Sequence, residues 1–190
     1  QLEHSGPLYG HDQALFGIVQ GSVFPELRAR SARGLQEVGF DGYAIGGLAV
    51  GEPIEAMYEM VSLCTEILPA EKPRYLMGVG TPANLLEAIE RGVDMFDCVL
   101  PTRNGRNAML FTRRGTLTLT NAKYKEDFAP VDDTCECPTC LRYSRAYLRH
   151  LFQVKELLAL QLATTHNLYF YQWLMRTAQA MIAEGRFAAW

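Results

Sequence analysis

The feature that most constrains the fold is the alternation of short apolar runs with amphipathic stretches along the first hundred residues. The apolar runs have the length of buried strands, and the stretches between them repeat apolar residues at the spacing of a helix. Such alternation predicts a parallel sheet with crossover helices, either an open α/β sheet or part of a barrel. The predicted strands are Ala14–Val19, Gly42–Ile45, Arg74–Met77 and Met95–Val99, and the predicted helices are Pro25–Val38, Pro53–Leu68 and Ala83–Arg91.

Two of these helices carry additional local signals. Thr81 and Pro82 precede the third helix as an N-cap and a proline at the first helical position. In the first helix the apolar residues fall on one side and the arginines fall elsewhere, which is the spacing of a helix. That side is formed by Leu27, Leu35 and Val38, and the arginines are Arg28, Arg30 and Arg33.

The number of repeats limits how much of a fold the chain can form. An eight-stranded (β/α) barrel takes about 250 residues, whereas this chain of 190 residues has four strand–helix repeats, the last without its helix. Four repeats correspond to half of such a barrel. The chain also lacks an initiator Met, and we therefore expect it to be part of a longer protein.

The pattern changes after Leu100. Ala108–Phe111 and Thr116–Thr120 predict a β-hairpin, and a cluster of cysteines follows it. Three amphipathic stretches then predict helices, and Gly185 is expected to end the last one. These stretches are Arg142–Phe152, Val154–Ala163 and Asn167–Glu184.

Composition places the chain among globular proteins. Hydrophobic residues make up 48% and charged residues 21%, which argues against disorder. No apolar run approaches the roughly 18 residues of a membrane span, and Gln1–His11 lacks the features of a secretory signal. We expect a cytoplasmic protein.

Charge is distributed unevenly along the chain. The net charge is −3, but residues 101–155 contain ten Lys and Arg against five Asp and Glu, so this segment carries +5 and the remainder −8. A basic segment beside an acidic body is suited to contact a nucleic-acid backbone. A solvated polar face without a partner explains the charge equally well.

The densest chemical signal is Cys135-Glu-Cys137-Pro-Thr-Cys140. Three thiols at this spacing can converge on one cation, and Zn²⁺ prefers four Cys and His ligands in a tetrahedral arrangement. The odd total of five cysteines also favours a metal over a disulfide framework. His150 and His166 are both candidates for the fourth ligand, and the spacing does not separate them. A closed set of four ligands predicts a structural role for the metal.

A second signal is Asp97, which lies at the end of an apolar strand between Phe96 and Cys98. A carboxylate there is costly to bury unless it is paired, hydrogen-bonded or catalytic, and chemistry in parallel α/β folds gathers at the carboxyl ends of strands. The competing interpretation is a structural Asp that caps the following loop. Arg103 and Arg106 follow at a spacing suited to hold a phosphate, although either could be an ordinary surface arginine.

Glycines follow three of the predicted strands. A planar ligand could approach the backbone closely at these glycines, which lie in Gln20-Gly21, Gly46-Gly47 and Gly78-Val79-Gly80. The Gln20 amide could form hydrogen bonds with the donor and acceptor groups on the edge of such a ligand. Glycine after a strand is more often only a turn. The third glycine and the acidic residue of a dinucleotide-binding fingerprint are not in place.

These segments together closely resemble the bacterial-type tRNA-guanine transglycosylases, also called queuine tRNA-ribosyltransferases. The matching segments span nearly the whole chain in the family's order, and Asp94-Met-Phe-Asp-Cys-Val-Leu-Pro-Thr-Arg103 is highly specific. The segments are Phe16–Ser22, Gly39–Glu52, Arg74–Pro82, Arg91–Asn107, Cys135–Cys140 and Thr165–Tyr171.

The resemblance implies an eight-stranded (β/α) barrel with a zinc-binding subdomain. Residues 1–107 would form the C-terminal part of the barrel and carry the nucleophile. Residues 108–166 would form the hairpin and the zinc subdomain, and residues 167–190 a helix that packs back on the barrel. The implied activity is base exchange at the wobble guanosine of tRNA through a covalent aspartyl intermediate, for which the base must leave its stack.

The resemblance also assigns the site residues. It implies that Asp97 is the nucleophile, that Arg103 and Arg106 contact tRNA, and that the protein is a homodimer through the zinc region. It selects His166 over His150 as the fourth ligand of one structural Zn²⁺. The implied base-pocket residues are Gln20, Gly47, Leu48, Met77 and Gly78, and the implied zinc ligands are Cys135, Cys137, Cys140 and His166.

The main departure from the family pattern is length. The family's N-terminal half, with its first barrel strands and a second essential aspartate, has no counterpart here, so we expect the chain to carry the nucleophile without a complete site. Leu48-Ala49-Val50 resembles the bacterial form, which favours an aminomethyl 7-deazaguanine precursor over queuine as the incoming base.

Three alternatives differ in what Asp97 does. A non-catalytic, zinc-stabilised RNA-binding module would not need it, and an accessory subunit of a heterodimeric transglycosylase would not need an intact site. The complete Cys₃His set and the intact Asp97 and Gly47 count against an accessory subunit. An α/β-barrel enzyme acting on a small substrate would show no dependence on RNA.

Overall fold

The computed structural model describes residues 10–190, which divide into two compact units. The first unit ends at Asp97, and the second extends from Cys98 to Trp190. Most of the polar N-terminal segment Gln1–His11 lies outside the described residues. No helix among residues 10–190 is long and apolar enough to cross a membrane.

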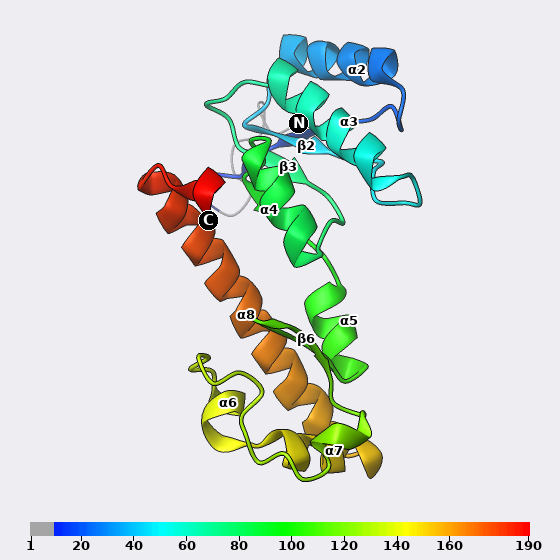
Figure 1. Cartoon of the computed structure of the whole chain (residues 1–190). Helices are drawn as coiled ribbons and strands as arrows, with labels where there is room; N and C mark the ends of the chain where they lie inside the picture. Colours follow the sequence, from blue (N-terminus) through cyan, green and yellow to red (C-terminus); the bar gives the residue numbers. More distant parts are fainter. Residues whose placement is uncertain (1–9) are drawn as a thin grey trace. The chain divides into compact units, whose positions relative to one another are not determined.

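The first unit is a four-stranded parallel sheet with helices between the strands (Figure 1). The strands pair in chain order, β1-β2-β3-β4, so every strand lies beside the one that follows it. This confirms the predicted parallel sheet with crossover helices. Its elements are β1 (Phe16–Val19), α2 (Pro25–Val38), β2 (Gly42–Ile45), α3 (Ile54–Ile67), β3 (Arg74–Leu76), α4 (Pro82–Glu90) and β4 (Met95–Phe96).

The parallel arrangement brings the carboxyl ends of all four strands to one edge of the sheet. Fully buried strand residues such as Ile45 and Leu76 pack with Met57 and Val61 of α3 in the core of this unit. The loops that carry the predicted base-pocket residues and Asp97 therefore all leave the sheet at the same edge.

Helix α2 has the predicted bounds. Of its apolar side, Leu35 packs against the core, but Leu27 is 43% exposed and Val38 72% exposed, whereas Ala32 and Arg28 are fully buried. The polar groups of the neighbouring loops explain the burial of Arg28, because they bind its guanidinium. Hydrophobic spacing alone does not reveal such a partner.

The second unit contains a two-stranded hairpin and four helices (Figure 1). The hairpin strands β5 (Met109–Thr112) and β6 (Gly115–Thr118) pair antiparallel as predicted. Its core combines hairpin residues, cysteines and the inner faces of the last two helices, including Leu110, Cys137, Leu148 and Ala163. The helices are α5 (Leu100–Arg106), α6 (Pro138–Arg142), α7 (Arg145–Gln153) and α8 (Leu157–Ala183).

Two expectations for the second unit are wrong. Val154–Ala163 and Asn167–Glu184 are not separate helices but parts of the continuous α8, which ends just before Gly185. Residues 100–106 form α5, which the sequence pattern did not predict. A Cβ added at Gly105 would lie 3.0 Å from the backbone nitrogen of Thr164, so glycine lets α5 lie backbone to backbone against α8.

Candidate active site and metal centre

Asp97 directly follows β4, with its carboxylate exposed at the carboxyl edge of the sheet. The strand ends at Phe96, three residues earlier than predicted, so Asp97 belongs to the loop and not to the strand. The carboxylate oxygen Oδ1 accepts hydrogen bonds from the Tyr75 hydroxyl at 2.6 Å and from the Gly78 N–H at 2.9 Å. Both donors come from β3 and its following loop, which orient the carboxylate.

These bonds also set the protonation of Asp97. The Tyr75 hydroxyl, followed by the Gly78 N–H, lowers the pKa of the Asp97 carboxyl below its ordinary value, because both donors stabilise the ionised form. Asp97 is therefore a carboxylate at neutral pH. An exposed, oriented and ionised carboxylate has the properties required of a nucleophile.

The Gln20 amide lies against the glycines that follow β2. A Cβ added at Gly46 would lie 2.8 Å from Gln20 Nε2, and one at Gly47 would lie 2.6 Å from Gln20 Oε1. Any larger residue would displace the amide. Two of the predicted base-pocket residues, Gln20 and Gly47, are therefore in direct contact, while Leu48 beside them is buried.

The same loop is closed by Glu52. Its carboxylate accepts hydrogen bonds from the N–H of Ala49 and from the N–H of Val50, the latter at 3.0 Å. Burial raises the pKa of Glu52, but hydrogen bonds from the loop backbone outweigh it and lower that pKa overall. Glu52 is thus an ionised cap that holds the loop after Leu48.

Met77 and Gly78 belong to the loop after β3. The Met77 N–H donates to the Ile45 carbonyl at 3.2 Å, which extends the pairing of β3 with β2 beyond the strand. Gly78 has a φ of +75°, in the left-handed region that favours glycine. This conformation accompanies the N–H contact of Gly78 with Asp97, so one predicted pocket residue directly supports the predicted nucleophile.

Arg103 and Arg106 lie in the second unit, on α5. They are three residues apart on the helix, so they share a face, and both are exposed. Among residues 10–190 neither guanidinium forms an ion pair. Both are therefore available to bind an anion.

Cys135, Cys137, Cys140 and His166 converge in the second unit, with their ligand atoms all within 4.8 Å of one another. The thiols of Cys135, Cys137 and Cys140 lie 3.9, 3.5 and 3.3 Å from His166 Nδ1. His150, the other candidate, is exposed and does not belong to the cluster. The four ligand atoms come from the loop before α6, from α6 itself and from the middle of α8.

Comparison with known proteins decides the family. A family model described as "Queuine tRNA-ribosyltransferase" matches residues 2–190. The chain belongs to the queuine tRNA-ribosyltransferase family. Proteins named queuine tRNA-ribosyltransferase from Thioalkalivibrio sulfidiphilus and Novosphingobium aromaticivorans are 55% and 57% identical over 177 and 185 residues, which is 93% and 97% of this chain. A third, from Caldanaerobacter subterraneus, is 58% identical over 92% of the chain.

The chain spans about half the length of the curated relatives that it matches. The matched regions make up 48%, 50% and 46% of the three relatives. The described units therefore correspond to the C-terminal part of a queuine tRNA-ribosyltransferase.

The cluster of this family member fits one structural Zn²⁺. Zinc–sulfur and zinc–nitrogen bonds of about 2.3 and 2.0 Å in a tetrahedron place the sulfur and nitrogen about 3.5 Å apart, close to the observed 3.3–3.9 Å. Cys137 and His166 are 0% and 1% exposed, so the four-ligand site is closed to substrate.

Hydrogen bonds outside the ligand set fix the ring of His166. Its Nε2 donates to the Phe111 carbonyl at 2.7 Å, so in the neutral ring that a metal requires Nδ1 would be the ligand atom, directed at the thiols. The neighbouring Asn167 is fully buried and connects three backbone segments. Its amide oxygen accepts from the Phe111 N–H, and its amide nitrogen donates to the carbonyls of Met109 and Pro101.

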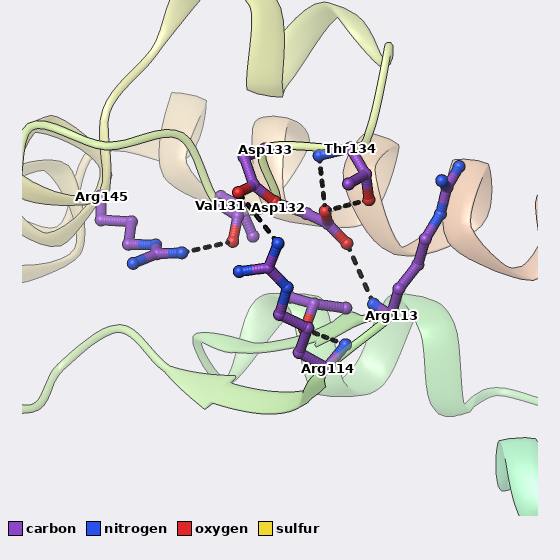
Figure 2. A network of polar contacts seen from close by, with 8 residues as sticks. Arg113, Arg114, Val131, Asp132, Asp133, Thr134 and Arg145 are labelled. Atoms are coloured by element: carbon purple, nitrogen blue, oxygen red, sulfur yellow. Dashed lines mark hydrogen bonds and ion pairs between the residues drawn. The ribbon is translucent and has the colours of Figure 1, made fainter.

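A second network anchors the loop that leads into Cys135 (Figure 2). One oxygen of Asp132 accepts from the Arg113 N–H at 3.0 Å, and the other accepts from the N–H and hydroxyl of Thr134. Arg145 Nη2 donates to the Val131 carbonyl at 3.0 Å. The loop is therefore held by the hairpin on one side and by α7 on the other.

Four residues of the site were not identified from the sequence. The sequence places Tyr75 in a predicted strand and Arg28 off the apolar side of a predicted helix, and it contains Glu52 and Asn167 only as members of matching segments. Each acts through a hydrogen bond to a partner 3 to 66 residues away in the chain. The one local signal was Asn167 directly after the ligand His166, because metal-binding histidines are usually supported by neighbouring polar groups.

Proposed function

We propose that this chain supplies the nucleophile of a tRNA base exchange in which the wobble guanine is replaced by a 7-deazaguanine precursor of queuosine. The observation that carries the proposal is the exposed Asp97 carboxylate, ionised and oriented by Tyr75 and Gly78. Membership of the queuine tRNA-ribosyltransferase family supports it. The proposed place of action is the cytoplasm.

The proposed reaction has two displacements at one carbon. An Asp97 oxygen attacks the anomeric carbon C1′ of the target ribose, a C1′–O bond forms, and the bond from C1′ to N9 of guanine breaks. Guanine leaves with the bonding electrons and gains a proton. The incoming base then loses its N9 proton and bonds to C1′, which releases the Asp97 carboxylate. Two inversions give net retention.

We further propose that Gln20, Gly47, Leu48, Met77 and Gly78 line the base site. Their loops leave the same edge of the sheet as Asp97, and the glycines allow close approach of a planar ring. The proposed incoming base is the aminomethyl 7-deazaguanine, because Leu48-Ala49-Val50 has the bacterial form. The four strands would be part of an eight-stranded barrel, within residues 1–107, completed by a segment that this chain does not span.

Arg103 and Arg106 are the proposed tRNA-binding residues. They are exposed, unpaired among residues 10–190 and three residues apart on α5. Arginine binds phosphate through parallel N–H donors and is suited to an RNA backbone.

A homodimer through the zinc-bearing unit is also part of the proposal. Phe128 and Leu141 are 80% and 69% exposed, and the Tyr143 and Tyr147 rings stack beside them with centroids 5.5 Å apart. Exposed aromatic residues of this kind are typical of interfaces. Light scattering of Tyr147→Arg tests the assignment, because a charge there should produce monomers, and an unchanged mass would refute this interface.

The activity is tested by incorporation of labelled guanine into tRNA. The assay uses the assembled enzyme, by which we mean this chain completed by the N-terminal half that the relatives have. Asp97→Asn should lower the exchange rate by at least about 1,000-fold, since it removes the nucleophile. Asp94→Asn is the matched control, because Asp94 only accepts the Arg74 N–H, at 2.8 Å, and an amide oxygen can replace it there.

Two outcomes would contradict the proposal. Exchange that survives Asp97→Asn would mean that another group is the nucleophile. If the unsubstituted assembled enzyme bound tRNA in a salt-dependent manner but exchanged no base, the chain would instead be an RNA-binding module.

A further inference from the structure

Arg28 of α2 is a fully buried cation, 0% exposed, for which the structure offers no acidic partner among residues 10–190. A buried charge is costly unless hydrogen bonds compensate it. The guanidinium is compensated by backbone carbonyls: Nε donates to Ser22 at 2.6 Å, and Nη2 donates to Gly46 at 2.9 Å and to Gly47 at 3.2 Å. The buried thiol of Cys64 also interacts with it. Its Nη1 is buried without a hydrogen-bond partner.

The carbonyls that Arg28 binds belong to the loops after two adjacent strands. Ser22 follows β1, and Gly46 and Gly47 follow β2. One turn further along α2, the hydroxyl of Ser31 accepts the N–H of Gln20 at 3.1 Å. One face of α2 therefore holds the backbone of both loops at the edge of the sheet where the base site is proposed.

Because the peptide unit is planar, the direction of each bound carbonyl also fixes the direction of the N–H that follows it. In a trans peptide the carbonyl and the next N–H point opposite ways, and no described peptide bond is cis. Because the carbonyls of Gly46 and Gly47 both point at Arg28 Nη2, the N–H groups of the next residues, Gly47 and Leu48, both point away from it. Within residues 10–190 neither of these N–H groups has an acceptor.

Glycine is required for this arrangement. Gly47 has a φ of +65°, which lets two consecutive carbonyls converge on one nitrogen. Gly21 has a φ of +141°, and a Cβ there would lie 2.7 Å from the backbone nitrogen of Arg28. The glycines allow Arg28 close access, and Arg28 in turn restrains loops that the glycines would otherwise leave free.

We propose that Arg28 is a positioning residue that determines base specificity: by holding the two glycine carbonyls, it directs two free N–H donors of the Gly46–Leu48 loop at a carbonyl on a planar base. Two donors on one side prefer an acceptor such as the O6 oxygen of guanine and reject an amino group in its place. Arg28 itself does not touch the base. This inference rests on the proposed function, because it refines the base site of that reaction.

The test compares guanine with 2,6-diaminopurine, which carries an amino group where guanine has the carbonyl. Arg28→Met removes the donors and retains most of the side-chain volume, and Arg28→Lys retains the charge with fewer donors. Val61→Ala is the matched control. Val61 is fully buried in the same core, and its side chain has no polar atom that could bind the guanidinium or these carbonyls.

The readouts are the calorimetric affinity of the assembled enzyme for each base and the KM and kcat of base exchange. Arg28→Met should lower the preference for guanine over diaminopurine by about tenfold or more, the effect of one lost hydrogen bond to a polar group. The change should appear in affinity and KM, with kcat within about threefold, because Asp97 is untouched. Arg28→Lys should fall between Arg28→Met and the unsubstituted enzyme, and Val61→Ala should lower the melting temperature without changing the preference.

If Arg28→Met lowers the melting temperature as Val61→Ala does and keeps the preference for guanine within about twofold, Arg28 only stabilises the core and the proposal is overturned. If Arg28→Met does not fold, Arg28→Lys decides by the same criterion. An unsubstituted enzyme that prefers guanine in calorimetry but does not exchange it refutes the proposed function and leaves the affinity test of Arg28 intact. One that shows no preference between the bases overturns the Arg28 proposal.

Discussion

The two units hold their central polar groups by similar means but expose them differently. In the first unit, Asp97 is fixed by a side-chain donor and a backbone donor, and its carboxylate is exposed. In the second unit, His166 and Asn167 are fixed by hydrogen bonds to backbone groups of β5, and they are 1% and 0% exposed.

The difference separates a reactive group from a structural one. An exposed carboxylate contributes little to folding but can reach a substrate. A buried Cys₃His set cannot reach a substrate, but its loss leaves unpaired polar groups in the core. Changes in the first unit should therefore alter chemistry at nearly constant stability, and changes in the second should alter stability.

The largest expected effect comes from removing the metal. Zinc binding is coupled to folding and contributes about 10–16 kcal/mol of apparent free energy in small zinc-finger peptides. Chelation should abolish amide-exchange protection from Thr134 to Glu184 while strands β1 to β3 stay protected. Metal content is measured in parallel, and a metal-free protein with undiminished protection in α8 would show that the site does not stabilise this unit.

The next effect concerns Asn167. Asn167→Ala leaves the Phe111 N–H and the carbonyls of Met109 and Pro101 without their partner, which should cost about 3 kcal/mol of stability. Amide exchange of α5 and β5 measures the loss, and Gln172→Ala, an exposed substitution on the same helix, should be within about 0.5 kcal/mol of the unsubstituted protein. Equal amide-exchange protection of α5 and β5 in the two variants would show that Asn167 does not stabilise the contact of α8 with α5.

Tyr75→Phe tests the expectation that a change in the first unit alters chemistry at nearly constant stability. Without the hydroxyl, the pKa of Asp97 should rise toward its ordinary value. Because the nucleophile must be ionised, the acidic limb of the exchange rate should move to higher pH, with little change in protonation at neutral pH. The stability contribution of this depressed pKa is present above the ordinary carboxyl pKa and is lost as pH falls through the lowered one.

A pH profile of single-turnover exchange measures the Tyr75→Phe shift. Tyr58→Phe is the control, because it also loses one hydroxyl hydrogen bond, to Asn84 at 3.0 Å, away from Asp97. If both variants had the profile of the unsubstituted enzyme, Tyr75 would not tune the carboxylate.

The smallest effect is expected for the arginines of α5. Arg103→Ala and Arg106→Ala should each weaken tRNA binding severalfold and reduce the salt dependence by about one phosphate contact. Filter binding at several salt concentrations measures this, with Arg30→Ala on α2 as an exposed control. A salt dependence unchanged by both substitutions would exclude α5 as a phosphate-binding surface.

The sequence was most informative where local rules decide the structure. Helix α2 and strand β2 have their predicted bounds because proline and glycine mark them. Thr81 caps α4 through the Asn84 N–H, as its spacing predicted. The cysteine spacing predicted the metal cluster because α6 turns Cys137 and Cys140 to the same side.

Prediction failed where distant contacts override local preference. Asn104 and Gly105 argue against a helix, yet α5 forms because α8 supplies a backbone surface for Gly105 and a donor for the Pro101 carbonyl. Thr164 and Thr165 suggested a break before His166, but packing keeps α8 continuous. Tyr75 became a partner of Asp97 only because parallel pairing aligns β3 with β4.

The central claim is that Asp97 forms a covalent bond to the ribose of tRNA. The most direct measurement is to trap the assembled enzyme with tRNA in the absence of free base, denature it, digest the RNA and map the modified peptide by mass spectrometry. The account predicts a ribose-linked nucleotide on Asp97 and none in Asp97→Asn. A modification on any other residue, or an adduct that persists in Asp97→Asn, would contradict it.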